Sequence, residues 1–279
     1  MSNDMTAKPE MRAQLAMKKH VDAFEQTVRS TIALAETFTE ADWALATECP
    51  GWSVKDVVSH IVSVEILLLG EDPAPGHILP DELPHVRGDM GRMLELGVDA
   101  RRAVPGAEVL AELRDVLERR LAALATTDPD EQTMAPTGRM VPYAMFMVFR
   151  AFDCWTHEQD VRRAVGRPGN LHAPGAECAR MILRQGLPMV VAKRAGAAPG
   201  QSVEFRIVRS GAEYVQVGVD GRGRLADGPE GPPTTTLSMD WETFVRLAAG
   251  RCAAADVEVG VEGDAELGTR VLAGLAVTP

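Results

Sequence analysis

The sequence predicts an α+β protein of two domains, a helical bundle followed by a small domain that contains a sheet. Apolar residues recur at helical spacing from about residue 10 to residue 165, whereas short alternating segments appear beyond residue 200. Between the two patterns lies 167–175, a segment rich in Pro and Gly that is the best candidate for a linker. We therefore expect an up-down four-helix bundle at 1–166 and an α+β domain with an antiparallel or mixed sheet at 176–279.

Apolar stripes locate the helices of the first domain. The stripe of the second helix begins after Ser53, which lies three residues before Asp56, a spacing that resembles a capping box. Pro142 is placed to begin the last helix, and Gly166 to end it. The predicted helices are 15–36, 53–71, 89–103, 106–126 and 142–166, and the predicted loops are 71–88 and 128–141.

Alternation of apolar and polar residues locates the strands of the second domain. Ser202–Val208 and Tyr214–Val219 alternate most clearly, and glycines mark the turns that follow them. The other predicted strands are 234–239 and 257–261, and the predicted helices are 176–194, 241–249 and 265–275.

Composition excludes several classes of function. The formal net charge is -11 and no cluster of Lys and Arg is present, which argues against binding to nucleic acid or to an anionic membrane. No apolar segment approaches the length of a membrane span, and residues 1–14 lack the apolar core of a signal peptide. Four cysteines lie far apart and form no CxxC pair, which disfavours a disulfide framework. The cytoplasm is the expected location.

Two groups of residues carry chemistry. His60 lies on the apolar side of its predicted helix, where a buried imidazole nitrogen needs a partner. A metal ion is one such partner, and a hydrogen bond to another core group is the alternative. Asp153 and His157 are four residues apart, so both side chains project from one face of their helix. A metal would neutralise a buried Asp153, and an ion pair with Arg150 is the alternative.

Neighbours of this pair have their own expected roles. Asp160 is three residues past His157 and lies close to the same face, where it could orient that imidazole. Glu158 points away and is expected either in solvent or paired with Arg162. Two histidines and one carboxylate with an open fourth position are the arrangement of catalytic zinc. The sequence therefore suggests one divalent metal ion between His60, Asp153 and His157.

The two motifs resemble those of a known family. Residues 49–65, CPGWSVKDVVSHIVSVE, and residues 150–168, RAFDCWTHEQDVRRAVGRP, resemble the two metal motifs of the mycothiol-dependent maleylpyruvate isomerase family. The resemblance implies a DinB-like four-helix bundle with a sterol-carrier-like second domain, and it places metal ligands at His60, Asp153 and His157. The isomerase itself has Glu where this chain has Asp153, whose side chain is one methylene shorter.

The resemblance also implies a function. The metal, expected to be Zn²⁺, would activate the thiol of mycothiol for attack on a small electrophilic substrate, giving isomerisation or S-transfer. The segment FVRLAAGR ends at Arg251 and resembles the part of the second domain that sends an arginine toward cofactor or substrate. Arg251 is thus a catalytic and cofactor-binding candidate, with a surface role at a helix end as the alternative. The expected partners are a small-molecule substrate and the thiol, for a chain acting as a monomer or homodimer.

Two other functions stay open on the sequence alone. The second domain could hold an apolar ligand such as a lipid, with a metal that is only structural and no turnover. The histidines and Asp153 could also be satisfied core groups of a bundle that binds no metal.

Overall fold

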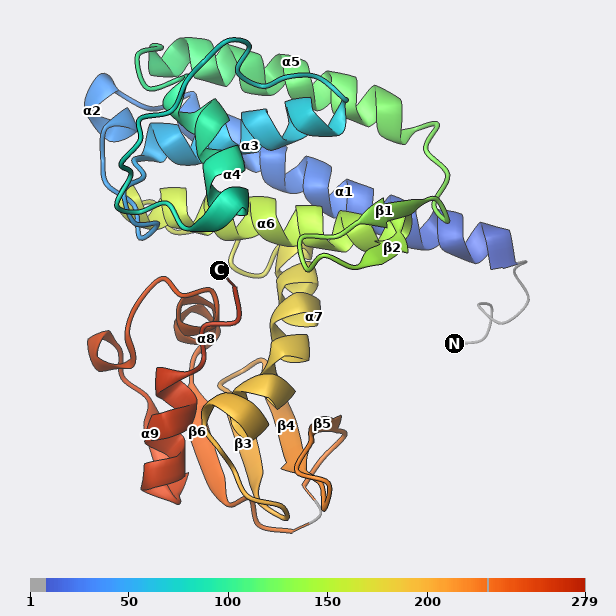
Figure 1. Ribbon diagram of the computed structural model, residues 1–279, viewed down its shortest axis with the longest axis vertical. Coiled ribbons are helices and arrows are strands. Elements are labelled where there is room, and N and C mark those ends of the chain that lie inside the picture. The colour runs from blue at the N-terminus through green and yellow to red at the C-terminus, as the bar shows by residue number, and fades with distance from the viewer. Residues whose placement is uncertain (1–8, 230, 279) are drawn as a thin grey trace. The chain divides into compact units, whose positions relative to one another are not determined.

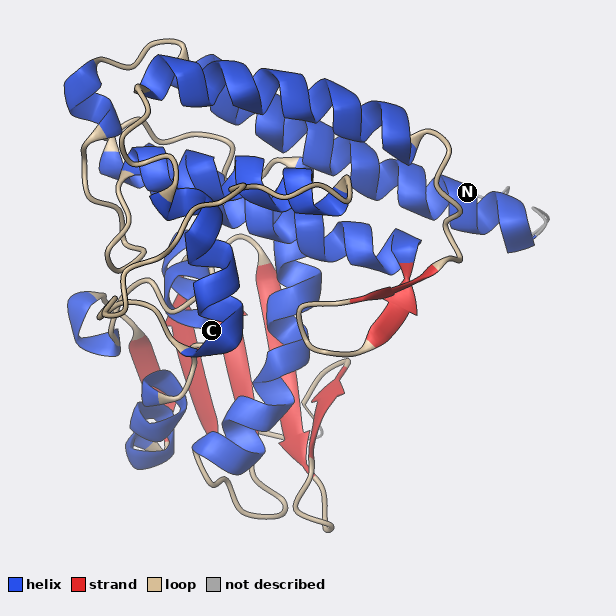
Figure 2. Ribbon diagram, turned by 45° about the horizontal axis from the view of Figure 1, so that its top comes forward, coloured by secondary structure: helices blue, strands red, loops and turns tan. Residues whose placement is uncertain are grey.

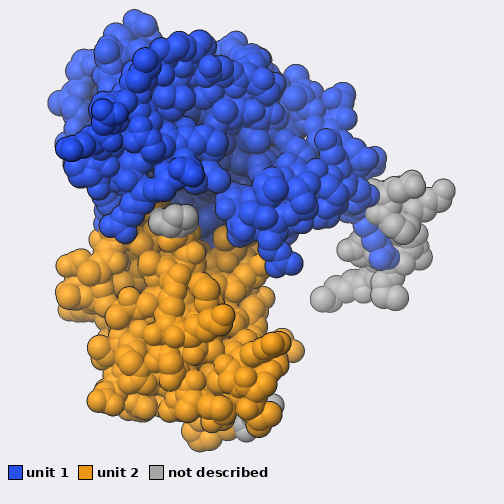
Figure 3. Space-filling model, in the orientation of Figure 1, with its two compact units in different colours: residues 1–179 blue, residues 180–279 orange. Residues whose placement is uncertain are grey.

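A computed structural model describes residues 9–229 and 231–278. The expectation that residues 1–14 form no signal peptide falls partly outside these described residues. The chain divides into two compact units, Met1–Ala179 and Arg180–Pro279, which are coloured separately in Figure 3. Helices fill the first unit and the second contains a five-stranded sheet, so the predicted α+β class is confirmed. Among the described residues, no helix has the length and apolar character needed to cross a membrane.

Four long helices build the first unit: α1 (Pro9–Ala35), α3 (Val54–Leu68), α5 (Gly106–Leu124) and α6 (Tyr143–Ala164). The helix α1 packs against α5 and α6, and α3 packs against the same two helices. The shorter α4 (Gly88–Asp99) and its flanking loops return the chain across the bundle, so that α3 and α5 run in the same direction (Figure 1). The α3 helix thus lies directly beside α6, which carries the second sequence motif.

The start of α3 is fixed by local hydrogen bonds. The Ser53 side chain accepts from the backbone N–H of Asp56, and the Asp56 carboxylate accepts from the Ser53 N–H at 2.8 Å. This reciprocal pair satisfies two of the N–H groups that a helix end leaves without partners. The predicted capping box is present. It is preceded by the one-turn helix α2 (Glu40–Trp43), whose N-cap Thr39 makes the same pair with Asp42.

The prediction of a plain loop at 128–141 is wrong. Two short strands, β1 (Gln132–Met134) and β2 (Met140–Pro142), pair antiparallel there with Thr133 opposite Val141. Strands of three residues are too short to show alternation, so the sequence pattern gave no signal for them. The hairpin leads directly into α6, for which Pro142 is the N-cap residue.

The second unit has a mixed sheet with the strand order β5-β4-β3-β6-β7. The strands β3 and β6 pair in parallel and the other neighbours pair antiparallel (Figure 2). The bounds are β3 (Ser202–Ile207), β4 (Gly211–Val217), β5 (Gly223–Ala226), β6 (Thr235–Met239) and β7 (Gly260–Gly263). The β5 strand was not predicted. The predicted strand at 257–261 is shifted, because residues 254–256 form a 3₁₀ turn and β7 begins only at Gly260.

Helices cover the apolar face of this sheet. Val203, Phe205 and Ile207 of β3 are buried, and the ring of Phe205 lies edge-on to Phe244, with 6.3 Å between centroids. Phe244 belongs to α8 (Trp241–Ala248), and α9 (Ala265–Ala273) packs on β6 and β7. The α7 helix (Pro174–Met189) ends in a π-helical turn at Val190–Arg194, so the predicted helix at 176–194 is present with an altered last turn.

Candidate metal centre

His60 lies on the second turn of α3 with its side chain 4% exposed. Its Nε2 is 3.3 Å from Asp153 Oδ2 of the neighbouring helix α6. Its Nδ1 is buried and has no hydrogen-bond partner. Burial lowers the pKa of His60 and outweighs the attraction of Asp153, so this imidazole is neutral near pH 7.

Asp153 and His157 occupy the same face of α6. His157 Nε2 is 3.7 Å from Asp153 Oδ1, and the two imidazole rings of His60 and His157 have centroids 4.7 Å apart. One ligand atom from each of the three side chains lies within 4.8 Å of the other two. The Asp153 side chain is 32% exposed, whereas both imidazoles are nearly buried. The cluster is therefore open to solvent on the Asp153 side.

Asp160 fixes the orientation of His157. Its Oδ2 lies 3.1 Å from His157 Nδ1, and its Oδ1 accepts from Arg163 Nη2 at 2.7 Å. The thiol of Cys49 donates to the same Oδ2 at 3.1 Å. An Nδ1–H directed at a carboxylate leaves Nε2 as the nitrogen that faces Asp153. The arrangement agrees with the predicted role of Asp160 as an orienting group.

The charges around His157 favour its protonated form in the absence of a metal. Burial by itself would lower the pKa of His157, but the negative charge of Asp153 and the hydrogen bond to Asp160 outweigh it and raise the pKa to about 10. A proton on Nε2 and a metal ion would compete for the same lone pair.

Asp153 also forms the ion pair that was the alternative to metal binding. Arg150 Nη1 donates to Asp153 Oδ2 at 2.9 Å. Burial would raise the pKa of Asp153, but the Arg150 guanidinium and the two imidazoles hold it well below its ordinary value. The carboxylate is therefore ionised. The ion pair with Arg150 is present and the histidine pair lies beside the same carboxylate, and metal binding there stays a prediction.

A buried ionic network that was not predicted extends from Arg150 into the bundle. Glu65 of α3 is 1% exposed and accepts from Arg150 and from Arg120 of α5. Arg120 Nη2 also donates to the hydroxyl of Tyr143 at 3.1 Å. A usable signal exists in the sequence, because Glu65 and Arg120 interrupt apolar stripes at positions that face the core.

Trp52 forms a wall of the cluster. Its ring centroid is 5.1 Å from that of His60 and 6.0 Å from that of His157. Its indole N–H donates to Glu95 Oε2 at 2.8 Å, so α4 positions this ring. Gly51 has φ 77°, and the His85 ring occupies the space that a Cβ there would need.

Glu158 is not in solvent. It is fully buried and accepts from Arg162 Nε at 2.7 Å, so the paired alternative is the one that the structure contains. The Ser30 hydroxyl of α1 donates to the same carboxylate at 2.7 Å. Glu158 therefore ties α6 to α1.

Arg251 lies in the second unit, three residues after the end of α8. It is half-buried, and its Nη1 donates to the Ala249 carbonyl at 2.8 Å. This contact is of the kind expected for an arginine at a helix end. A role toward substrate or cofactor stays a prediction.

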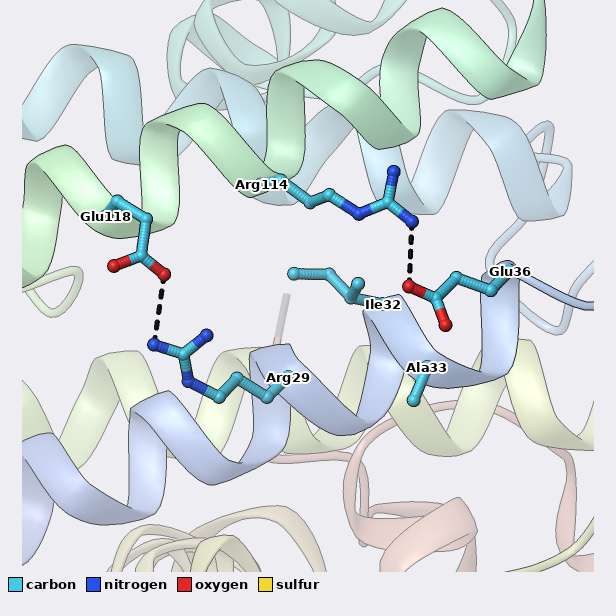
Figure 4. Close-up of a pocket in the computed structure, with 6 residues that line it drawn as sticks. All are labelled: Arg29, Ile32, Ala33, Glu36, Arg114 and Glu118. Carbon is cyan, nitrogen blue, oxygen red and sulfur yellow. Dashed lines mark hydrogen bonds and ion pairs between the residues drawn. The ribbon is translucent and has the colours of Figure 1, made fainter.

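The described surface also has a hollow of about 340 Å³ between α1 and α5. Ile32 and Ala33 lie between two ion pairs there, Arg29–Glu118 and Arg114–Glu36 (Figure 4). None of the three clustered side chains lines this hollow, so it is separate from the candidate centre.

The donor set of the cluster suits a divalent metal such as Zn²⁺. Two imidazole nitrogens and one carboxylate oxygen are ligands that zinc takes in catalytic sites, where three protein ligands leave one position open. A carboxylate that lies between two buried imidazoles fits this donor set. A second group, Cys49, His157 and Asp160, also has ligand atoms that lie within 4.8 Å of one another.

Comparisons with known proteins agree with the sequence motifs. Residues 24–162 match the family model of the mycothiol maleylpyruvate isomerase N-terminal domain, a range that includes all three clustered side chains. No curated protein matches the chain. Crystal structures of the mycothiol-dependent maleylpyruvate isomerase and of a histidine-to-alanine mutant of it are similar in fold. For each, the TM-score is 0.51 and the identity 15%, over 91% of this chain and 93% of the other. Through residues 24–162, the chain belongs to the mycothiol maleylpyruvate isomerase N-terminal domain family.

Proposed function

We propose that the chain is a metal-dependent enzyme that activates a low-molecular-weight thiol for attack on a small electrophilic substrate. His60, Asp153 and His157 are the proposed ligands of a single divalent metal ion, expected to be Zn²⁺. The observation that carries the proposal is that one nitrogen or oxygen from each of these side chains lies within 4.8 Å of the other two. Isomerisation and S-transfer both begin with this attack.

The metal would supply a positive charge that keeps a thiol cosubstrate in its deprotonated, nucleophilic form. The protein's own groups orient the proposed histidine ligands and cover them. Asp160 holds the Nδ1–H of His157, and Trp52 covers both imidazoles. The exposed edge of Asp153 is the side from which small molecules would reach the cluster.

Mycothiol is the proposed thiol, because the family model and the similar crystal structures carry that name. We propose that Arg251 holds an anionic end of the substrate or thiol by paired hydrogen bonds. The proposed domains are 1–166 for the metal-binding bundle and 176–279 for the sterol-carrier-like domain. We also propose that the chain acts in the cytoplasm, for which its acidic composition is suited, and that it acts as a monomer or homodimer.

The test measures zinc content and thiol consumption together. Purified protein is loaded with Zn²⁺ and mixed with mycothiol and a panel of small electrophiles, including maleylpyruvate. We expect about one zinc per chain, and consumption of thiol or isomerisation of substrate that chelation abolishes. His60→Ala should lose metal and activity together. The matched control is His172→Ala, because His172 is exposed and outside the cluster.

Two results would contradict the proposal. Stoichiometric zinc in His60→Ala would mean that the ligand set is wrong. Bound zinc with no turnover of any electrophile, together with binding of an apolar ligand, would favour the alternative of a carrier protein with a structural metal.

A further inference from the structure

We propose that Arg150 is a positioning residue of the metal centre, which holds the Asp153 carboxylate in place between His60 and His157. The inference rests on the proposed function, because it needs Asp153 to be a ligand. Its basis is a guanidinium that touches two carboxylates, one inside the bundle and one in the cluster.

Arg150 uses the two ends of its guanidinium for different partners. Its Nε and Nη2 donate to Glu65 Oε1 at 3.0 and 2.5 Å, while its Nη1 donates to Asp153 Oδ2 at 2.9 Å. The planar group has fixed donor directions, so the contact with Glu65 determines where Nη1 points. The position of Asp153 is therefore set from α3, the helix that also carries His60.

The two oxygens of Asp153 are not equivalent as a result. Oδ2 accepts from Arg150 and lies 3.3 Å from His60 Nε2, whereas Oδ1 is the oxygen nearest to His157 Nε2, at 3.7 Å. The carboxylate held by Arg150 therefore has one oxygen toward each imidazole. Because the side chain of Asp153 is short, a small rotation of this carboxylate would move both oxygens away from the imidazoles.

The surroundings prevent Arg150 from leaving this position. Three of the charged side chains are almost fully buried, with exposed fractions of 2% for Arg120, 1% for Glu65 and 5% for Arg150. Ion pairs join them in series, from Arg120 to Glu65, from Glu65 to Arg150 and from Arg150 to Asp153. The four charges sum to zero, and a buried charge left alone would carry a large desolvation cost. The network is thus a fixed support for one ligand, with its far end on Tyr143.

Arg120 provides a matched control. Like Arg150, it is a buried arginine whose Nε donates to Glu65, at 2.7 Å, but its Nη2 donates to Tyr143 and not to Asp153. Lysine at either position can keep a positive charge beside Glu65, but its single ammonium group lacks the further N–H donors with which a guanidinium reaches a second partner. Arg150→Lys and Arg120→Lys therefore disturb the same ionic core, and only the first should disturb Asp153.

The experiment compares the full-length wild type with both variants. Zn²⁺ dissociation constants are measured by competition with a chromophoric chelator, the visible spectrum is recorded after Co²⁺ loading, and thermal unfolding is followed without metal. We expect both variants to lose a similar amount of thermal stability. Arg150→Lys should bind Zn²⁺ about 10- to 100-fold more weakly and change the Co²⁺ spectrum. Arg120→Lys should keep the wild-type affinity and spectrum.

Three results overturn the inference, and they are distinguishable. Wild-type affinity and spectrum in Arg150→Lys would show that Arg150 does not position the ligand. Equal losses of affinity in both variants would show that only the stability of the core matters. Absence of stoichiometric metal in the wild type would remove the metal centre itself, and with it the proposed function.

Discussion

Asp160→Asn is the substitution that examines the orientation of His157 most sharply. The carboxylate of Asp160 now accepts on both oxygens, from His157 Nδ1 on one and from Arg163 on the other. An amide has one acceptor and one donor end. Arg163 can only donate, so it will favour the amide oxygen, and the NH₂ group will face His157.

The expected consequence is the wrong tautomer of the imidazole. With an amide N–H opposite it, Nδ1 loses its proton and becomes the acceptor, and the remaining proton stays on Nε2, the nitrogen that faces Asp153. Loss of such an orienting group costs about 10- to 100-fold in metal affinity. At about 1.4 kcal/mol for each factor of ten, this is roughly 1.4–2.8 kcal/mol of metal-binding free energy.

The assay is zinc competition at pH 7.5, with Cys49→Ala as the control. The Cys49 thiol donates to the oxygen of Asp160 that faces His157. Cys49→Ala removes this donor and leaves both acceptor oxygens of Asp160 in place, so it should have little effect on zinc affinity. Arg163 also contacts Glu48 at 2.8 Å, so Asp160→Asn leaves it an anionic partner. Unchanged affinity in Asp160→Asn, or an equal loss in Cys49→Ala, would refute this account of His157.

Other predictions concern protonation and stability. Because the pKa of His157 in the metal-free protein is raised to about 10, zinc binding at pH 7.5 should release about one proton, and affinity should rise as pH increases toward 10. Calorimetry in buffers of different ionisation enthalpy measures the release, and none at all would contradict the protonated state. Gly106→Ala places a Cβ 2.5 Å from the Trp43 ring and should lower the free energy of unfolding by about 1–3 kcal/mol. Gly91→Ala, where the nearest atom is 3.4 Å away, should not lower it; equal losses in denaturant titrations would reject the packing argument. Ser53→Ala should cost about 0.5–2 kcal/mol through the lost cap, and no change in the same titrations would reject it.

Much of the fold was predictable because long elements repeat their pattern many times. The 15-residue α3 and the 22-residue α6 each carry enough apolar positions to define a face. The four-residue β5 and the three-residue β1 and β2 do not, and their pairing depends on partners elsewhere in the chain. The direction of α5 relative to α3 depends on the α4 crossover, which no local pattern encodes.

The candidate site likewise has features that local spacing predicts and features that depend on tertiary contacts. Helical spacing alone predicts that Asp153 and His157 share a face, and the structure has this arrangement. The approach of His60 requires α3 to pack on α6, a tertiary contact that was expected because both helices belong to one bundle and that the family resemblance also implied. Glu65 and Arg120 were not predicted, because a charge inside an apolar stripe does not indicate which partner it would have in the core. In the structure, such charges are buried and paired.

X-ray absorption at the zinc edge is the most direct test of the central claim, that His60, Asp153 and His157 bind one metal ion. The zinc-loaded protein should show imidazole nitrogen and carboxylate oxygen at about 2.0–2.2 Å and no sulfur, and added mycothiol should introduce one sulfur at about 2.3 Å. Sulfur in the absence of added thiol would instead indicate ligation by Cys49 and would contradict the proposed ligand set.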